Sequence, residues 1–284
     1  MTIKNTGVPV DDPERPTPDG DEQAVTAVRG RRVRSVLWGT VPVLTFVVLL
    51  GAWALAVRLF KIPQYLLPGP EDVLPRIGED WTSLWQNSVV TIKEILFGFG
   101  LTIVTAIPLG LLIALSAVGR RLVYPLLVFI QLVPKIAIAP LFLVWFGFGM
   151  SSKVVLTLLM TFFPLLLASI SGFQILDQRL LYLTRSMGAG RWQTFRYLRF
   201  PSALPVIFSG LKTAATIAAT AAIVAEFVGA NEGLGYQLLQ GTSTLDTELI
   251  FVVLLLLTLI GVALNYIVEF LEYILTPWQR KENQ

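Results

Sequence analysis

The sequence predicts an all-α polytopic membrane protein with about six transmembrane helices. Of its 284 residues, 54% are hydrophobic and 14% are charged, and the mean hydropathy of +0.69 is far above that of a soluble domain. The apolar residues form blocks of roughly twenty, the length at which a helix crosses about 30 Å of hydrocarbon. We place the spans at about 36–57, 88–116, 122–146, 152–175, 203–229 and 249–275.

Residues 1–35 are expected to form a disordered tail before a membrane domain over 36–284. Val8 to Glu22 holds four prolines and six acidic residues with almost nothing to bury. Ala54-Leu55-Ala56 resembles a signal-peptide cleavage site, but the apolar run before it lies too far from the terminus and is too long for a signal peptide. We therefore expect the first span to be a retained anchor.

The other spans predict a kinked and closely packed bundle. Span 88–116 is long and begins with amphipathic spacing, so its first turns are expected at the interface. Span 203–229 is rich in alanine, which lets helices approach closely. Prolines inside spans remove a backbone hydrogen bond and kink the helix, and they stand at Pro42, Pro108, Pro134, Pro140 and Pro164. Such a bundle fits a protein that changes conformation and equally a static one.

Basic residues gather near one face, which predicts that both termini are cytoplasmic. About thirteen lie near that face: Arg29, Arg31, Arg32, Arg34, Arg120, Arg121, Arg179, Arg185, Arg191, Arg196, Arg199, Arg280 and Lys281. About four lie near the other: Arg58, Lys61, Arg76 and Lys153. The net charge of +3 thus reflects membrane topology, and it is no sign of nucleic-acid binding.

The chain contains no cysteine and no histidine, so it offers no thiol nucleophile, imidazole base or Cys/His metal site. It also lacks a Gly-x-x-x-x-Gly-Lys-Ser/Thr loop for nucleotide phosphates. We expect no catalytic residues, no metal site and no cofactor bound by this chain.

A polar segment at 177–205 separates two of the apolar spans. Asp177 is placed to cap a helix that carries three leucines, and Gly188 and Gly190 interrupt that helix. A second short helix then places Trp192, Phe195 and Leu198 three residues apart, and Pro201 and Pro205 are expected to end it before the next span. An interfacial helix with its aromatic residues among lipid headgroups would show the same pattern.

The spacing of this segment and several motifs around it resemble one known family. Gly188 is followed after nine residues by Leu198-Arg199-Phe200-Pro201, where that family has Ile-x-Leu-Pro. Pro134-Lys135-Ile136-Ala137, Leu143-Val144-Trp145-Phe146-Gly147 and Ala225-Glu226-Phe227-Val228-Gly229 resemble its branch for sulfonates, taurine, nitrate and thiamine-type pyrimidines. Over about residues 64–275, the chain is thus similar to the permease subunit of a binding-protein-dependent ABC importer.

The resemblance implies a type I ABC importer transmembrane fold in the inner membrane, with 177–205 as a coupling element seated in a separate ATPase subunit that binds ATP. The residues carried over as ATPase-docking are Gly188, Arg191, Trp192, Phe195, Leu198 and Pro201. The other implied partners are an extracytoplasmic substrate-binding protein, a second copy of the chain and the lipid bilayer. Tyr182-Leu183-Thr184 stands where the family has Glu-Ala-Ala, so the usual carboxylate is missing from the element.

Charged residues within spans are functional candidates, because they are costly in hydrocarbon. Lys135, beside Pro134, either faces the substrate pathway and favours an anion, or is satisfied by proline-freed carbonyls or a carboxylate on another helix. Glu226 either faces the pathway or pairs with a neighbour. Lys93 and Glu94 are expected to snorkel at the outer interface.

The predicted function is inward transport of a small solute, either an organic anion or a heterocyclic vitamin precursor, by alternating access. One alternative is a secondary transporter or channel that works without an ATPase, but it should carry ion-coupling carboxylates at mid-membrane, and the acidic residues here lie near span ends. A polytopic membrane enzyme would need a convergent set of catalytic groups, and the chain lacks the usual ones.

Overall fold

The computed structural model describes residues 44–45 and 47–278, and throughout this part the regular elements are helical. The chain divides into two compact units, one ending at Lys61 and the other beginning at Ile62. Within the described part of the first unit lies a helix over Val47–Leu59. The predicted tail at 1–35 and residues 36–43 and 46 of the predicted span 36–57, including the predicted kink at Pro42, lie outside the described residues.

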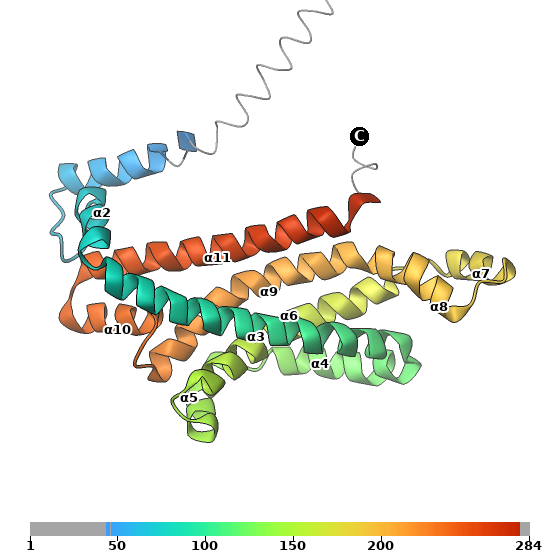
Figure 1. Ribbon diagram of the computed structural model, residues 1–284. Coiled ribbons are helices and arrows are strands. Elements are labelled where there is room, and N and C mark those ends of the chain that lie inside the picture. The colour runs from blue at the N-terminus through green and yellow to red at the C-terminus, as the bar shows by residue number, and fades with distance from the viewer. Residues whose placement is uncertain (1–43, 46, 279–284) are drawn as a thin grey trace, which may run out of the picture. The chain divides into compact units, whose positions relative to one another are not determined.

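The second unit is a bundle of long helices with shorter helices at both ends (Figure 1). In chain order, its elements are α2 (Pro70–Glu79), α3 (Trp81–Leu115), the π-helical turn η1 (Gly119–Val123), α4 (Tyr124–Gln131), α5 (Lys135–Phe146), α6 (Met150–Gln174), α7 (Gln178–Ser186), α8 (Arg191–Thr194), the π-helical turn η2 (Phe195–Arg199), α9 (Phe200–Gly229), α10 (Leu234–Thr244) and α11 (Thr247–Leu275).

Within the described residues, four helices are long and apolar enough to cross a membrane: Trp81–Leu115, Met150–Gln174, Arg191–Gly229 and Thr247–Leu275. They confirm the predicted spans 88–116, 152–175, 203–229 and 249–275, although the first begins seven residues earlier than predicted.

The predicted span 122–146 is broken. Its two parts, Arg121–Gln131 and Lys135–Phe146, meet at an angle of 90°, which makes them a broken span or a re-entrant loop. The break falls at Pro134, which has no N–H to donate and disfavours the helical conformation of Val133 before it. Pro108, Pro140 and Pro164, in contrast, lie inside uninterrupted helices.

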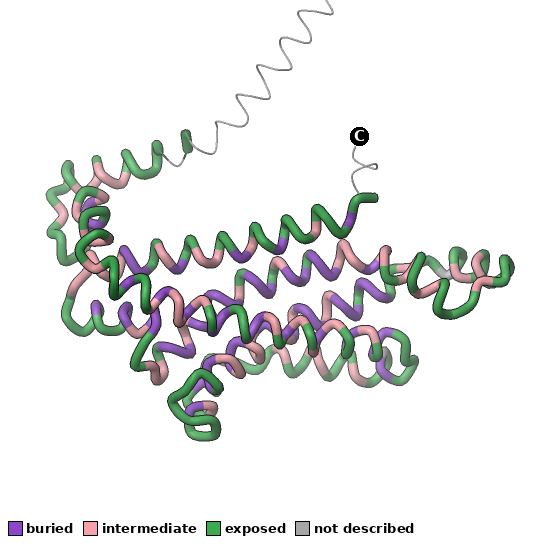
Figure 2. Tube along the Cα trace, viewed as in Figure 1, coloured by how far each residue is buried: buried purple, intermediate pink, exposed green. Residues whose placement is uncertain are grey.

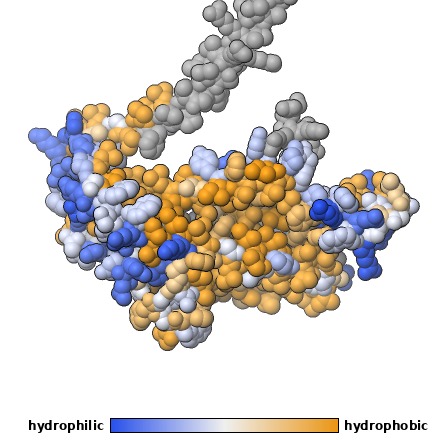
Figure 3. Space-filling view, viewed as in Figure 1, coloured by the Kyte–Doolittle hydropathy of each residue, from blue (hydrophilic) through white to orange (hydrophobic). Residues whose placement is uncertain are grey.

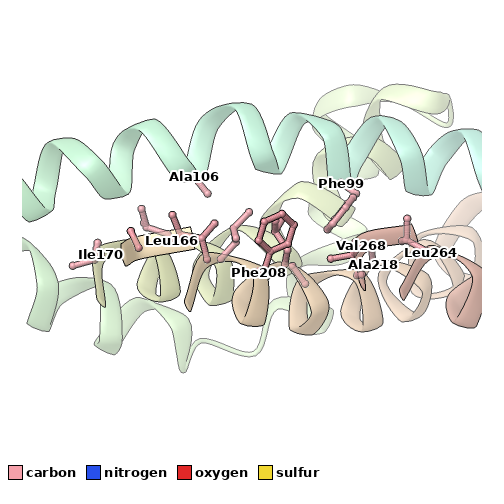
Figure 4. Close-up of a cluster of buried hydrophobic side chains, with 14 of the residues drawn as sticks. Phe99, Ala106, Leu166, Ile170, Phe208, Ala218, Leu264 and Val268 are labelled. Carbon is pink, nitrogen blue, oxygen red and sulfur yellow. The ribbon is translucent and has the colours of Figure 1, made fainter. Parts of the chain in front are cut away.

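The core of the bundle lies where α3, α6 and α9 meet. Figure 2 shows buried residues concentrated along α6 and α9, whereas α7, α8 and the turn between them are mostly exposed. In Figure 4, Phe99 and Ala106 of α3 face Leu166, Ile170 and Phe208 across this core. The predicted close packing of the alanine-rich span is confirmed, because its alanines are buried: Ala203, Ala214, Ala215, Ala218, Ala219, Ala221, Ala222 and Ala225.

The surface of the bundle alternates between apolar and polar zones along its length. On the face drawn in Figure 3, hydrophobic residues cover the middle of the long helices, and hydrophilic residues gather around α2 and around α7 and α8. This is the pattern of helices whose middles face hydrocarbon and whose ends face water.

Candidate functional site

The segment 177–205 folds as the short helix α7 and the first turns of the long helix that begins at Arg191, at one end of the bundle and away from α10 (Figure 1). Asp177 begins α7 with extended backbone, and its Oδ1 accepts a hydrogen bond from the Arg179 N–H at 2.9 Å. The predicted N-cap is therefore confirmed. Thr184, in place of the family's second alanine, donates its hydroxyl to the Leu180 carbonyl at 3.0 Å.

Gly188 closes α7 with a backbone turn that favours glycine. Its φ is +79°, in the left-handed region. The Gly188 N–H donates to the Arg185 carbonyl and the Ala189 N–H donates to the Thr184 carbonyl, both at 3.0 Å. These two bonds form the Schellman motif, which satisfies carbonyls at a helix end. The glycine thus fixes the angle at which the chain leaves α7.

The second half of the element runs directly into the next span. Gly190 precedes α8, and its N–H donates to Gln193 Oε1 at 2.8 Å. From Arg191 the helix continues without a break to Gly229, so the predicted end at Pro201 and Pro205 is wrong. Phe200 N–H donates to the Phe195 carbonyl in a π-helical turn directly before Pro201. This wider turn gives the proline ring room, so the helix continues past it.

The aromatic residues of the second helix are anchored at one end and exposed at the other. Phe195 stacks on Phe173 of α6 with centroids 6.5 Å apart, and so belongs to the edge of the core. Trp192 also stacks on Phe195, with centroids 5.7 Å apart, and 71% of Trp192 is exposed. Leu198 and Pro201 are half-buried, whereas Arg191 is exposed. The predicted docking residues therefore lie together, and Trp192 protrudes furthest among the apolar ones.

Sequence reasoning missed further exposed apolar side chains on this element. Their signal was visible, because apolar residues follow one another in an otherwise polar segment. They are Leu180, Tyr182, Leu183, Met187 and Tyr197. Two of them stand where the family has Glu-Ala, so this element exposes more apolar surface than the family pattern implies.

Lys135 lies at the start of α5, directly after the break. Its Nζ donates to the Gln131 carbonyl at 2.8 Å and lies 5.1 Å from the centroid of the Phe163 ring. The break frees the Gln131 carbonyl, so this bond matches the expectation that proline-freed carbonyls satisfy the lysine. It leaves the expectation that Lys135 faces the substrate pathway open. No carboxylate pairs with Lys135 in the part of the chain that the structure describes.

Glu226 lies in a different place, inside a buried polar cluster near α10. Its carboxylate accepts hydrogen bonds from the Thr91 hydroxyl at 2.7 Å and from the Gly235 N–H. The Thr91 hydroxyl oxygen accepts in turn from the Leu234 N–H at 2.9 Å. Of the two predicted roles for Glu226, pairing with neighbours matches these contacts, and no described contact joins it to Lys135.

Glu94 belongs to the same cluster, so the expected snorkelling of this residue is wrong. Its side chain is 0% exposed, and its Oε1 accepts from Lys153 Nζ at 2.6 Å. Lys153, which the charge count placed near an outer face, is 5% exposed at its side chain. Lys93, the neighbour of Glu94, is exposed. The sequence carried a signal for this cluster, because Ser88, Thr91 and Glu94 share one helix face.

A family model supports the resemblance to ABC importer permeases that the sequence motifs indicated. Residues 106–281 match the model of the binding-protein-dependent transport system inner membrane component. The chain belongs to this family. The resemblance read from its motifs is thereby confirmed, and this permease is a multi-pass component of the inner membrane.

Characterised relatives of the permease match over most of their length. The formylaminopyrimidine transport permease protein of Halalkalibacterium halodurans is 37% identical over 242 residues, which cover 85% of this chain and 96% of the relative. The riboflavin transport system permease protein of Chloroflexus aurantiacus is 36% identical, over 83% and 88%. The taurine transport system permease protein of Escherichia coli is 28% identical, over 84% and 90%.

A solved structure shares the fold of the permease. The MetNI methionine ABC transporter, in an inward-facing conformation, superposes with a TM-score of 0.51 at 20% identity, over 69% of this chain and 97% of that chain. The predicted type I importer fold is thereby confirmed.

Proposed function

We propose that this permease carries a small solute into the cell by alternating access, driven by a separate ATPase that docks on residues 177–205. The docking element and both termini face the cytoplasm, and a soluble binding protein delivers the solute to the opposite face. Two copies of the chain enclose the pathway. ATP hydrolysis takes place in the partner subunit, and this chain catalyses no covalent step.

The observation that carries the proposal is the exposed Trp192 on a rigid support. Trp192 is an exposed aromatic side chain with Arg191 next to it in sequence, and tryptophan and arginine are typical of the residues that dominate protein–protein binding. Trp192 is held by stacking on Phe195, which is itself held by Phe173. Little side-chain entropy is lost when such a preorganised residue enters a groove, so the element suits a partner that must transmit force.

The names of the relatives indicate the class of solute. Their names refer to formylaminopyrimidine, riboflavin, taurine and aliphatic sulfonates. These are small polar solutes, heterocyclic in the first two cases and sulfonated in the last two. We propose a solute of this size for the permease.

Purification of the tagged chain from its native membranes tests the docking proposal. The wild-type permease should bring down a P-loop ATPase, identified by mass spectrometry, and Trp192→Ala should lose it while still inserting in the membrane. Trp81→Ala is the matched control. Trp81 is also an exposed tryptophan stacked on an aromatic residue, Trp85, but both lie on α3, outside the docking element.

Two results would refute the proposal. If the wild-type chain recovers no ATPase, the transporter works by another energy source. If Trp192→Ala and Trp81→Ala retain the ATPase equally, Trp192 contacts lipid headgroups instead of a protein.

A further inference from the structure

One face of α9 exposes hydroxyl groups along a mainly apolar helix, whose charged residues are Lys212, ion-paired with Glu272, and the buried Glu226. Ser209, Thr213, Thr216 and Thr220 follow one another at spacings of four, three and four residues, which places them on a single face. All four are exposed, whereas the alanines of the opposite face are buried. We call these four residues the hydroxyl stripe.

Polar groups beside the stripe argue against contact with lipid tails. Asn265 of α11 donates its side-chain N–H to the Thr216 hydroxyl at 3.1 Å. Thr213 and Thr216 use their own hydroxyl protons on the carbonyls of Ser209 and Lys212, but the Thr220 hydroxyl bonds to no other described residue. An amide and a free hydroxyl are costly in hydrocarbon, so side chains of this kind face protein or water.

Thr216 and Thr220 of the stripe line two hollows, whereas Ser209 and Thr213 line neither. One hollow, of about 540 Å³, lies between α9 and α11 and includes Glu269. The other, of about 570 Å³, lies at the break between α4 and α5 and includes Lys135. Each is large enough for a small organic solute.

The hollow at the break carries a positive charge that no described carboxylate pairs with. Lys135 uses one of its three N–H groups on the Gln131 carbonyl, and its ammonium lies near the Phe163 ring. The other lining residues are mainly apolar, among them Met160, Pro164 and Ile217, and the carboxylate of Glu269 lines only the other hollow. A lysine in this setting attracts a negatively charged group, because apolar walls leave its field weakly screened.

We infer that the hydroxyl stripe and Lys135 line a water-accessible path, closed by a second copy of the chain, through which a small solute with a carboxylate, sulfonate or phosphate group passes. The inference rests on the proposed transport function and narrows its solute to an anion. A single chain leaves both hollows open at its surface, and a polar path through a membrane must be enclosed by protein. The stripe supplies hydroxyl groups for the solute's polar atoms, and Lys135 supplies the charge.

Cysteine labelling of the full chain in native membranes tests the inference. The wild-type chain has no cysteine, so each introduced thiol is unique. Thr220→Cys should react with water-soluble methanethiosulfonates in right-side-out or inside-out vesicles. Val104→Cys is the control, because Val104 is 70% exposed on α3 and lines neither hollow; its thiol should stay unlabelled in hydrocarbon.

The charge of the path is read from two methanethiosulfonates of similar size, one carrying a sulfonate and the other a trimethylammonium group. At Thr220→Cys, the anion-to-cation rate ratio, normalised to a free thiol, should fall about fivefold when Lys135→Gln is added, as expected if the lysine attracts the anion and repels the cation by about 0.5 kcal/mol each. Lys135→Arg should keep the ratio.

If Thr220→Cys labels no faster than Val104→Cys, the stripe is not part of a water-accessible path and the inference fails. If it labels but Lys135→Gln leaves the ratio unchanged, the path is not selective for anions and the inference also fails. Neither measurement depends on ATPase binding, so failure of the docking proposal would show separately in the purification experiment.

Discussion

Replacing Lys153 by methionine removes the only described cation from a cluster that holds two buried carboxylates. Lys153 Nζ lies 2.6 Å from Glu94 Oε1, and both side chains are almost fully shielded from water. Glu94 Oε2 has no hydrogen-bond partner among the described residues, so this carboxyl depends on the lysine. Glu226 lies in the same cluster and accepts hydrogen bonds from two neutral donors, the Thr91 hydroxyl and the Gly235 N–H.

We expect Lys153→Met to lower the free energy of unfolding by about 3–5 kcal/mol, the typical cost of removing one partner of a buried ion pair. Equilibrium unfolding of the purified permease in mixed detergent micelles, followed by tryptophan fluorescence, measures the change. Methionine keeps the length and most of the volume of lysine, so the loss reports charge and hydrogen bonding more than packing.

Two further variants make this prediction refutable. Adding Glu94→Gln to Lys153→Met removes both charges of the pair, and should restore most of the lost stability. Lys93→Met is the matched control, since Lys93 adjoins Glu94 in sequence but is exposed, and it should change stability by less than about 0.5 kcal/mol. If Lys153→Met is no more harmful than Lys93→Met, the ion pair does not stabilise the fold.

Two glycines give further predictions. Gly188→Ala should destabilise the end of α7 by about 1–2 kcal/mol, because alanine resists a φ of +79°. Gly190→Ala should be nearly neutral, because its φ is −69° and an added Cβ would meet only Gln193 Oε1 within 4 Å, at an ordinary contact distance of 3.7 Å. Co-purification of the ATPase should fall only in Gly188→Ala, and equal recovery in both variants would show that the turn is not needed. Gly235→Ala should lower stability in the micelle assay by about 1–3 kcal/mol, because a Cβ would lie 2.8 Å from a Glu226 carboxylate oxygen and 3.1 Å from a backbone carbonyl. Gly100→Ala, inside α3 with nothing near it, should instead be neutral or stabilising, and similar losses in both variants would contradict this reading.

The fold could be predicted largely from the sequence, because hydrocarbon imposes a simple length rule on apolar helices. The four continuous spans follow that rule. The predicted span 122–146 follows this rule less well, because it is broken before Lys135. A proline inside an apolar run predicts that the helix bends but not by what angle, and packing against neighbouring helices sets the angle.

The candidate sites were only partly predictable, for a different physical reason. Local hydrogen bonds set the cap at Asp177 and the turn at Gly188, and residue types report such bonds directly. The pairing of Glu94 with Lys153 joins residues 59 positions apart in sequence, and depends on how α3 packs on α6. A single sequence carries no record of that packing, so Glu94 read as an interfacial residue.

The unbroken helix from Arg191 to Gly229 has a mechanical consequence. At 39 residues it is about 58 Å long, and it carries Trp192 near one end and Glu226 near the other. If the helix tilts as one body about one end, a tilt of about 5° shifts the other end by roughly 5 Å over that length. Such a displacement exceeds the tolerance of the hydrogen bonds around Glu226, which hold the turn at Gly233–Gly235. We therefore expect that a small movement of this helix at the Trp192 end would break hydrogen bonds of the turn at Gly233–Gly235 at the other end.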